Sequence, residues 1–289
     1  MNKINTLKIK DLPVFPDILL NLNRVLHSKS VTIDTVNTII ERDPALTAKI
    51  LKLANSSYYG LSYMVGTLKK AITVLGFNTI RNLAVTVSVS GIFTANTSRS
   101  VDVQKLWHHS IGCAIASKSL LTGKNPLIQE KAFMGGILHD IGKIIILLNF
   151  PEDTKKIIEK IRGNKLLTES EAERELLGFD HADLGSFIAE KWHFPKELAC
   201  SISLHHNPEQ FPSFTGKLEN REEAELLVYT IYTGNQIAKA MALGTSSDPL
   251  VSNINPTAWQ KLGITEKDLP SVILKIKENF KEVIDSWNM

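Results

Sequence analysis

The feature that most constrains how this chain folds is a histidine–aspartate pair inside an apolar segment. His139 and Asp140 follow Gly135–Leu138 and are followed closely by the aliphatic run Ile144–Leu148. Apolar residues on both sides predict that the pair is buried in a helical core. An unpaired buried carboxylate is very costly, so the fold must bring a partner to Asp140. A metal ion is one such partner, because imidazole and carboxylate are both metal ligands and one carboxylate can bridge two cations.

Composition predicts a soluble, cytoplasmic protein. The chain has 289 residues, with 43% hydrophobic and 22% charged residues, as in globular proteins. Its net charge is only +3 and no dense Lys/Arg cluster occurs, so a nucleic-acid partner is not expected. No aliphatic run is long enough to span a bilayer, and the N-terminus lacks the features of a signal peptide. Cys113 and Cys200 match neither a disulfide framework nor a Cys-x-x-Cys site, so we expect them to pack in the core.

Apolar residues recur at helical spacing along almost the whole chain, and no long β-type alternation competes with them. This pattern predicts an all-α, multi-helix bundle. Apolar stripes mark helices around 18–25 and 33–40, and Asp43-Pro44 predicts the start of a third. Gly76 to Asn78 predicts a tight corner between two helices. Further helices are predicted over 103–121, 129–149, 152–163, 168–177, 181–192, 195–206 and 221–243, with another from Leu269 to Trp287.

The polar segment Thr94–Ser100 is the best candidate for a boundary between packed units. We therefore predict an N-terminal helical part over 1–100, which begins with an extended stretch at 12–16. A helical core over 101–245 carries the candidate site. A helical tail follows over 246–289.

Several histidines lie on otherwise apolar helical faces. His109 shares its face with Cys113, and His181 and the pair His205-His206 lie on similar faces further along the chain. Residues three and four apart point the same way, so these imidazoles should face the interior. Any one of them alone is better explained as a hydrogen-bonded core residue. Together with His139 and Asp140, their common inward direction predicts a metal site. The three other histidines are expected at the surface or in structural roles: His27, His108 and His193.

The order of these residues resembles the HD superfamily of metal-dependent phosphohydrolases, and more specifically the HDOD-domain proteins. The similarity extends from about residue 12 to about residue 243. It rests on seven segments: Leu12–Pro16, Asp43–Thr47, Ala54–Ser57, Ala71–Gly76, Trp107–Ser110, Gly136–Lys143 and Glu173–His181. The resemblance implies an HD-domain-like helical core with an N-terminal helical subdomain. It also implies that six residues occupy ligand positions: His109, His139, Asp140, His181, His205 and His206.

Three departures from the family pattern bear on activity. Asn235 stands where catalytic relatives have a final aspartate ligand, and an amide is a poorer ligand that neutralises no charge. Lys105 stands at a position that is acidic in some three-metal relatives. The segment Asn207–Pro212 lacks the Gly-Tyr-Pro signature of the HD-GYP branch, which disfavours cleavage of cyclic di-GMP.

The resemblance implies a cytoplasmic signalling module that acts through contacts with other signalling proteins. We expect one or two divalent ions, with iron, manganese or zinc favoured by the imidazole-rich set. The alternative is a metal-dependent phosphohydrolase acting on a nucleotide or another phosphate ester. In that case Asp140 would orient the attacking water and Lys143 would stabilise charge on the phosphate. Lys143 could equally extend to solvent from its helix. A purely structural scaffold would require the inward histidines to be incidental.

The segment Asn55–Tyr59 is a candidate interaction surface, although a helix C-terminal turn with partly buried aromatic rings explains it better.

Overall fold

A computed structural model of the chain describes residues 16–26, 28, 30–94, 101–164, 166–245 and 250–288. Within these ranges all regular secondary structure is helical, which confirms the predicted fold class. The described residues form two compact units, one over 93–273 and the other over 16–92 together with 274–288. These units differ from the division predicted above, since residues 250–273 group with the central helices and 274–288 with the N-terminal ones.

The smaller unit is built from short capped helices. Thr32 and Asp43 cap two of them by accepting backbone N–H bonds from Thr35 and Leu46, and Pro44 begins the second as predicted. Gly76 lies inside a long helix with φ 81° and breaks it at the predicted corner. The unit contains α1 (Asp17–Leu26), α2 (Ile33–Ile40), α3 (Pro44–Ala54), the 3₁₀ turn η2 (Ser57–Tyr59), most of α4 (Leu68–Thr94) and most of α14 (Leu269–Asn288).

Asn55 ends α3 and ties the following loop to it. Its side chain donates to the Val65 carbonyl at 2.9 Å and accepts from the Val65 N–H at 2.7 Å. Tyr58 and Tyr59 are half-buried in η2, the short turn between Asn55 and Val65. The structural role of this segment, a helix C-terminal turn, therefore accounts for its sequence.

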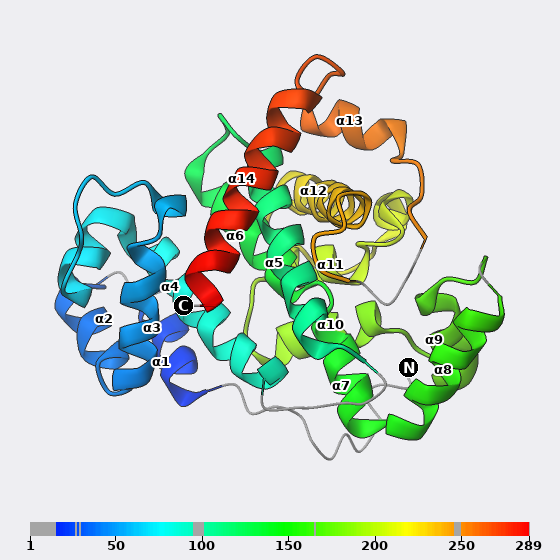
Figure 1. The fold of residues 1–289 in the computed structure, drawn as a ribbon, viewed down its shortest axis with the longest axis horizontal. Helices are drawn as coiled ribbons and strands as arrows, with labels where there is room; N and C mark the ends of the chain where they lie inside the picture. The colour runs from blue at the N-terminus through cyan, green and yellow to red at the C-terminus, as the bar shows by residue number, and fades with distance from the viewer. Residues whose placement is uncertain are drawn as a thin grey trace. The chain divides into compact units, whose positions relative to one another are not determined.

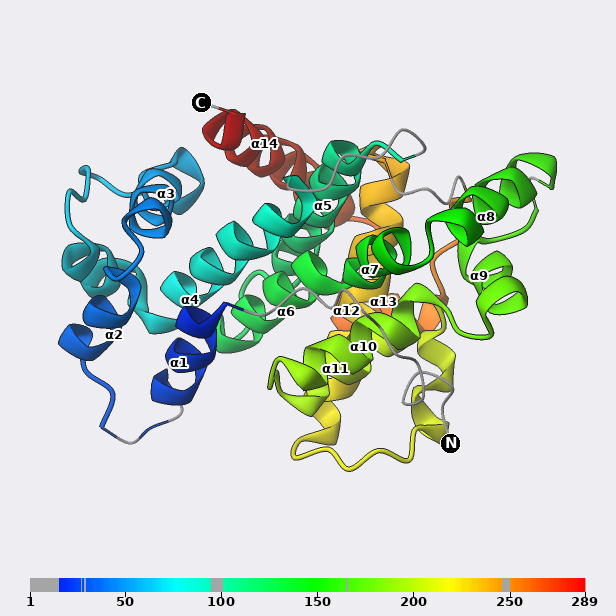
Figure 2. The same cartoon turned by 90° about the horizontal axis from the view of Figure 1, so that it is seen from below.

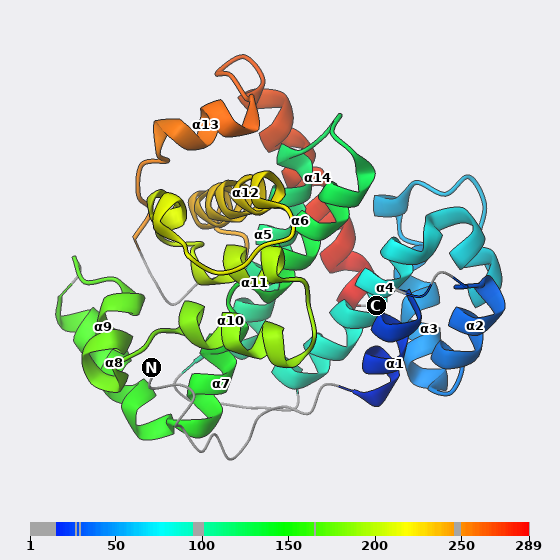
Figure 3. The ribbon, with the colours of Figure 1, turned by 180° about the vertical axis from the view of Figure 1, so that it is seen from behind.

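The larger unit holds the remaining helices. Figure 1 shows α5 and α6 side by side near its centre, and α12 packs against both. Figure 2 shows α8 and α9 as neighbours next to α7, and Figure 3 shows α10 and α11 near α12. The helices are α5 (Val103–Leu120), α6 (Pro126–Leu138), α7 (Ile141–Asn149), α8 (Pro151–Gly163), α9 (Glu169–Leu177), α10 (His181–Lys191), α11 (Lys196–Ser203), α12 (Arg221–Ala240) and α13 (Pro256–Leu262), with the 3₁₀ turn η3 (Pro208–Ser213).

The single helix predicted over 129–149 is wrong, because the chain breaks at the histidine–aspartate pair. His139 still has helical angles, with φ −55° and ψ −37°, whereas Asp140 has φ −101° and ψ 11°. The break redirects α7 away from α6.

Helix α11 also ends earlier than predicted, at Ser203, so His205 and His206 lie in the turn that follows it. Helix α13 was not predicted. Residues 12–15, His27 and residues 95–100, on which other predictions rest, lie outside the described residues.

Glycines on both sides of the pair let other helices approach it. A Cβ on Gly136 would lie 2.4 Å from the Cα of Ala114 on α5. A Cβ on Gly142 would lie 2.0 Å from the carbonyl oxygen of His181 at the start of α10. Both contacts are backbone to backbone, so no side chain can relieve them. The sequence around Asp140 is therefore fitted to close contact with the two helices that carry His109 and His181.

Among the residues that the structure describes, two segments have the length and hydropathy of a membrane span, Leu68–Phe93 and Pro126–Asn149. In the second, 83% of the apolar window is buried inside the protein's own fold, and the chain breaks within it at Asp140. Core helices of soluble proteins pass the same test, so this is weak support for a membrane location.

Replacing Gly136 by alanine should lower the free energy of unfolding by about 1–3 kcal/mol, because the added methyl group overpacks the contact with α5. Gly91→Ala on the exposed face of α4 is the control, since a Cβ there meets nothing within 4 Å. That change should raise stability by about 0.5–1 kcal/mol through helix propensity. Chemical denaturation measures both. Equal effects would contradict the close packing of α5 and α6.

Candidate metal centre

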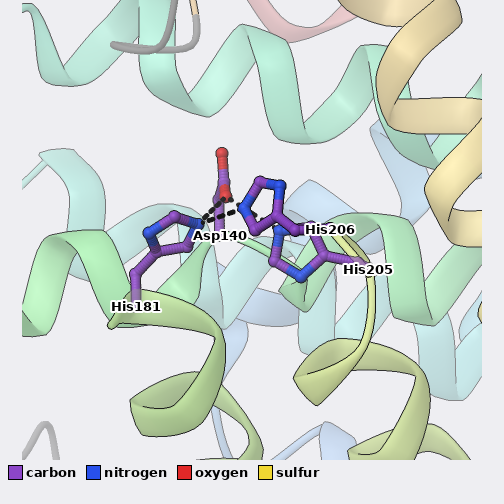
Figure 4. Close-up of side chains that lie close together, drawn as sticks. All are labelled: Asp140, His181, His205 and His206. Atoms are coloured by element: carbon purple, nitrogen blue, oxygen red, sulfur yellow. Dashed lines mark hydrogen bonds and ion pairs between the residues drawn. The ribbon is translucent and has the colours of Figure 1, made fainter. Parts of the chain in front are cut away.

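The structure brings all seven residues at the predicted ligand positions together inside the larger unit. His109 comes from α5, His139 and Asp140 from the junction of α6 and α7, and His181 from the first position of α10. His205 and His206 come from the turn after α11, and Asn235 from α12. Figure 4 shows Asp140 with the rings of His181, His205 and His206 gathered around it. The predicted convergence of inward-facing side chains is thus what the fold produces.

The carboxylate of Asp140 is the centre of the cluster, and its side chain is 1% exposed. Its Oδ1 lies 3.4 Å from His181 Nε2 and 3.7 Å from His205 Nε2. Its Oδ2 lies 3.4 Å from His139 Nε2 and 3.8 Å from His109 Nε2. Four imidazole nitrogens therefore face one carboxylate, each slightly beyond hydrogen-bonding distance.

The inner polar atoms of this cluster lack hydrogen bonds. Neither Asp140 oxygen has a partner of hydrogen-bond geometry, although Oδ2 is ion-paired with the Lys143 ammonium, and Nε2 of His139 and of His205 has no partner either. Buried polar atoms are rarely left in this condition unless an ion or a water completes them. The potential ligand atoms form two groups whose members lie within 4.8 Å of one another, and Asp140 belongs to both. Imidazole nitrogens and a carboxylate are the donor set of a transition-metal or zinc site, so these residues fit a divalent ion.

The outer ring nitrogens are held in place by acceptors. Nδ1 of His139 lies 2.8 Å from the Gly136 carbonyl, and Nδ1 of His205 lies 2.6 Å from the Ile202 carbonyl. Since a carbonyl only accepts, each of these Nδ1 atoms carries the proton and each Nε2 keeps its lone pair. This arrangement, with Nδ1–H bonded outward and Nε2 directed inward, is typical of metal-binding histidines.

Burial keeps the imidazoles neutral. Removal from water lowers the pKa of His109 and of His139 to about 4 and that of His205 to about 3, although the Asp140 carboxylate opposes the shift. Burial also lowers the pKa of His181 and His206 well below the usual value. For Asp140, burial acts to raise the pKa, but His139, Lys143 and the other nearby imidazoles hold it well below its usual range. Neutral imidazole and ionised carboxylate are the protonation states that metal binding requires.

Lys143 does not extend to solvent, so that alternative for this residue is wrong. Its side chain is 5% exposed and its ammonium lies 3.0 Å from Asp140 Oδ2 and 2.9 Å from Glu169 Oε2. Burial alone would lower the pKa of Lys143, but the Asp140 and Glu169 carboxylates outweigh it and raise the pKa above its usual value. The ammonium is therefore a permanent positive charge beside the centre.

Asn235 contacts the cluster through His109, whose Nε2 lies 3.0 Å from the amide Oδ1. His206 Nε2 lies 2.8 Å from His181 Nε2. His206 is half-buried, whereas the other four histidines of the cluster are fully buried.

Away from the cluster, His193 is exposed as predicted and His108 is half-buried. Both cysteines are buried, in agreement with core packing.

Two buried glutamates of α9 were missing from the sequence-based site. Glu173 Oε2 accepts from the backbone N–H of His181 at 2.8 Å and lies 2.6 Å from its Nδ1. Glu169 pairs with Lys143 as described above. Burial, followed by the Glu169 charge, raises the pKa of Glu173 well above its usual value. The sequence did hold one indication of their burial. Glu169 and Glu173 are four residues apart, which places both on the same face of α9 as buried Ala172.

A family model described as the HDOD domain matches residues 12–208. An uncharacterized protein of Treponema pallidum (strain Nichols) is 24% identical over 210 residues, which cover 71% of this chain and 40% of that protein. The chain thus matches less than half the length of this relative.

Solved structures share the fold. An HDOD domain protein with unknown function from Geobacter sulfurreducens has a TM-score of 0.75 and 24% identity, covering 94% of this chain and 93% of that one. A Shewanella amazonensis SB2B protein, proposed to be a phosphohydrolase, has a TM-score of 0.72 and 23% identity over 96% of both chains. A Marinobacter aquaeolei VT8 protein, proposed to act in signal transduction, has a TM-score of 0.72 and 20% identity, covering 99% of this chain and 60% of that one.

Replacing Lys143 by methionine should lower the free energy of unfolding by about 3–5 kcal/mol, because it leaves two buried carboxylates uncompensated. Lys156→Met is a matched control: Lys156 pairs with an aspartate three residues earlier at the same 3.0 Å, but with 62% of its side chain exposed. That change should cost less than about 1 kcal/mol. Urea denaturation of both variants measures the difference. Similar losses would show that Lys143 is not a buried counter-charge.

Proposed function

This chain belongs to the HDOD family, and we propose that it is a regulatory module of signal transduction that binds a divalent metal ion at its histidine–aspartate centre. One observation carries the metal-binding part: five neutral imidazoles gather at a buried carboxylate whose Oδ1 has no hydrogen-bond partner, and Nε2 of His139 and of His205 has none either. The Lys143 ammonium compensates the carboxylate only at Oδ2. A bound cation would supply the interactions that Oδ1 and the inner Nε2 atoms lack.

The donor set favours iron, manganese or zinc over calcium or magnesium. Imidazole nitrogens dominate the cluster, and hard cations such as calcium prefer oxygen ligands. The lowered pKa values of the histidines leave the Nε2 atoms available near neutral pH without prior loss of protons.

Two features of the site favour a regulatory role over catalysis. Asn235 contributes no negative charge where a carboxylate would strengthen binding of a second metal. The Lys143 ammonium is engaged by Asp140 and Glu169 and is not directed to solvent. The relative from Marinobacter aquaeolei proposed to act in signal transduction agrees with this function.

The second candidate function is a metal-dependent phosphohydrolase, with a nucleotide or another phosphate ester as substrate. The specific observation in its favour is the full set of five histidines with Asp140, and the Shewanella amazonensis relative proposed to be a phosphohydrolase agrees with it. A bound divalent ion supplies activation of water for attack on phosphorus. Asp140 would then orient the water, and half-buried His206 marks the side of the cluster nearest to solvent.

Metal analysis of the purified protein tests the proposal. We expect stoichiometric iron, manganese or zinc, and an increase in thermal stability on adding metal to chelator-treated protein. The gain should reach about 2.7 kcal/mol when free metal is 100 times its Kd. Asp140→Ala should abolish both effects. His108→Ala, next to His109 but outside the cluster, should preserve them.

A screen with phosphodiester and nucleotide substrates, run with each metal, separates the two functions. Metal binding without turnover supports the regulatory module. Turnover that disappears in Asp140→Ala would replace it with the phosphohydrolase. Absence of bound metal under all loading conditions would refute metal binding in either form.

A further inference from the structure

The ring of His181 cannot be oriented in the way that two of its neighbours are. His139 and His205 lie at or just after the C-terminal ends of α6 and α11, and each Nδ1 donates to the carbonyl three residues earlier, that of Gly136 or Ile202. Such carbonyls are available because the last four of a helix have no partner within it. His181 is instead the first residue of α10, where a helix leaves N–H groups without partners and not carbonyls. An acceptor for its Nδ1 must therefore come from another element.

Glu173 on α9 supplies that acceptor. Its side chain is 2% exposed, and its Oε2 lies 2.6 Å from His181 Nδ1 and 2.8 Å from the His181 backbone nitrogen. Oε2 accepts the backbone N–H, and a carboxyl oxygen has two lone pairs, so the same oxygen accepts the Nδ1–H as well. This holds both for a carboxylate and for a neutral carboxyl group whose proton is on Oε1. One oxygen thus binds the backbone and the ring of the same histidine.

This contact selects one of two possible orientations of the imidazole. A ring turned by half a rotation about its Cβ–Cγ bond occupies nearly the same space, but it exchanges Nδ1 with Cδ2 and Nε2 with Cε1. In the observed orientation His181 Nε2 lies 3.4 Å from Asp140 Oδ1 and 2.8 Å from His206 Nε2, as Figure 4 shows. In the turned orientation a C–H group would face both atoms, and Glu173 Oε2 would lose its ring donor. The hydrogen bond to Glu173 therefore favours the orientation that directs Nε2 into the cluster.

The next residue of α9 holds the start of α10 in place. Arg174 donates from Nε to Asp180 Oδ2 at 2.9 Å, and Asp180 is the N-cap of α10. The Arg174 guanidinium also lies 3.3 Å from Asp183 Oδ2 in the first turn of that helix. Two consecutive residues of α9 thus bind two consecutive residues at the start of α10, Glu173 to His181 and Arg174 to Asp180. This double attachment keeps the Glu173 carboxyl group within reach of the ring.

We propose that Glu173 is a positioning residue of the centre. It holds the His181 ring with the Nδ1–H directed to α9 and the Nε2 lone pair directed to Asp140. Its consequence for metal affinity rests on the proposed function. The orientation of the ring does not, because it depends only on contacts between the chain's own residues.

Nitrogen-15 NMR of the histidine-labelled full chain, treated with chelator, tests the orientation directly, since the ring nitrogen that carries the proton differs in chemical shift from the one that does not. We expect His181 in the Nδ1–H form. Glu173→Ala should convert it to a mixture of both tautomers, whereas Glu173→Gln should retain the Nδ1–H form because an amide oxygen can accept the same two bonds. Glu175→Ala, at an exposed position of the same helix, is the matched control and should leave the His181 signals unchanged.

An Nε2–H form of His181 in the wild-type chain, or the same tautomer in the wild type and in Glu173→Ala, would overturn the inference. If Glu173→Ala does not fold, the wild type and Glu173→Gln decide the question: the Nδ1–H form in both supports the inference, and the Nε2–H form in either contradicts it.

Titration of the same chelator-treated proteins with Mn²⁺ tests the consequence for the centre. Glu173→Ala should weaken Mn²⁺ binding about 10- to 100-fold, as expected for loss of the group that orients a ligand. Glu173→Gln and Glu175→Ala should bind Mn²⁺ nearly as tightly as the wild type. Equal affinity in Glu173→Ala and the wild type would contradict the positioning role. Absence of Mn²⁺ binding in the wild type would count against the proposed function, and the NMR spectra would still decide whether Glu173 orients His181.

Discussion

The buried charge of Asp140 is the constraint on which the larger unit depends. The chain leaves helical geometry at this residue, and four imidazole nitrogens and one ammonium lie within 3.8 Å of its oxygens. His139 and Lys143 are neighbours of Asp140 in the chain, whereas His109, His181 and His205 come from segments far away in the sequence. Their approach requires glycine at positions 136 and 142, where no side chain can fit. The short segment from Gly136 to Gly142 therefore supplies two candidate ligands, His139 and Asp140, and also the glycines that let α5 and α10 pack closely against it.

The sequence predicts much of this arrangement because its signals are local. Apolar spacing indicates the helices, and helical phase directs His109 and His181 inward. The sequence could not show the break at Asp140. Apolar residues continue on both sides of it, and a change in one residue's φ and ψ angles does not alter their spacing. The prediction missed Glu169 and Glu173 because acidic residues are common on solvent-facing helix surfaces. The burial of Lys143 depends on Glu169, so neither residue could be understood without the fold that pairs them.

Family membership and chemistry are separate questions for this chain. The match over residues 12–208 and the similar solved structures establish the HDOD domain and its fold. Related proteins with that fold have been proposed both as a phosphohydrolase and as a signal-transduction protein. A shared fold does not decide between such functions; the residues at the site do. Here those residues are an amide at position 235, an ammonium held between two carboxylates, and a cluster that is buried except at half-buried His206.

The contact between Gly142 and the carbonyl of His181 has a mechanical consequence. Because the two backbones are already in contact, the first turns of α7 and α10 cannot come any closer together. Asp140 and His181 each lie at or next to one of these turns, so this contact sets a lower limit on their spacing. Any side chain at position 142 would force the two turns apart and so move Asp140 away from His181.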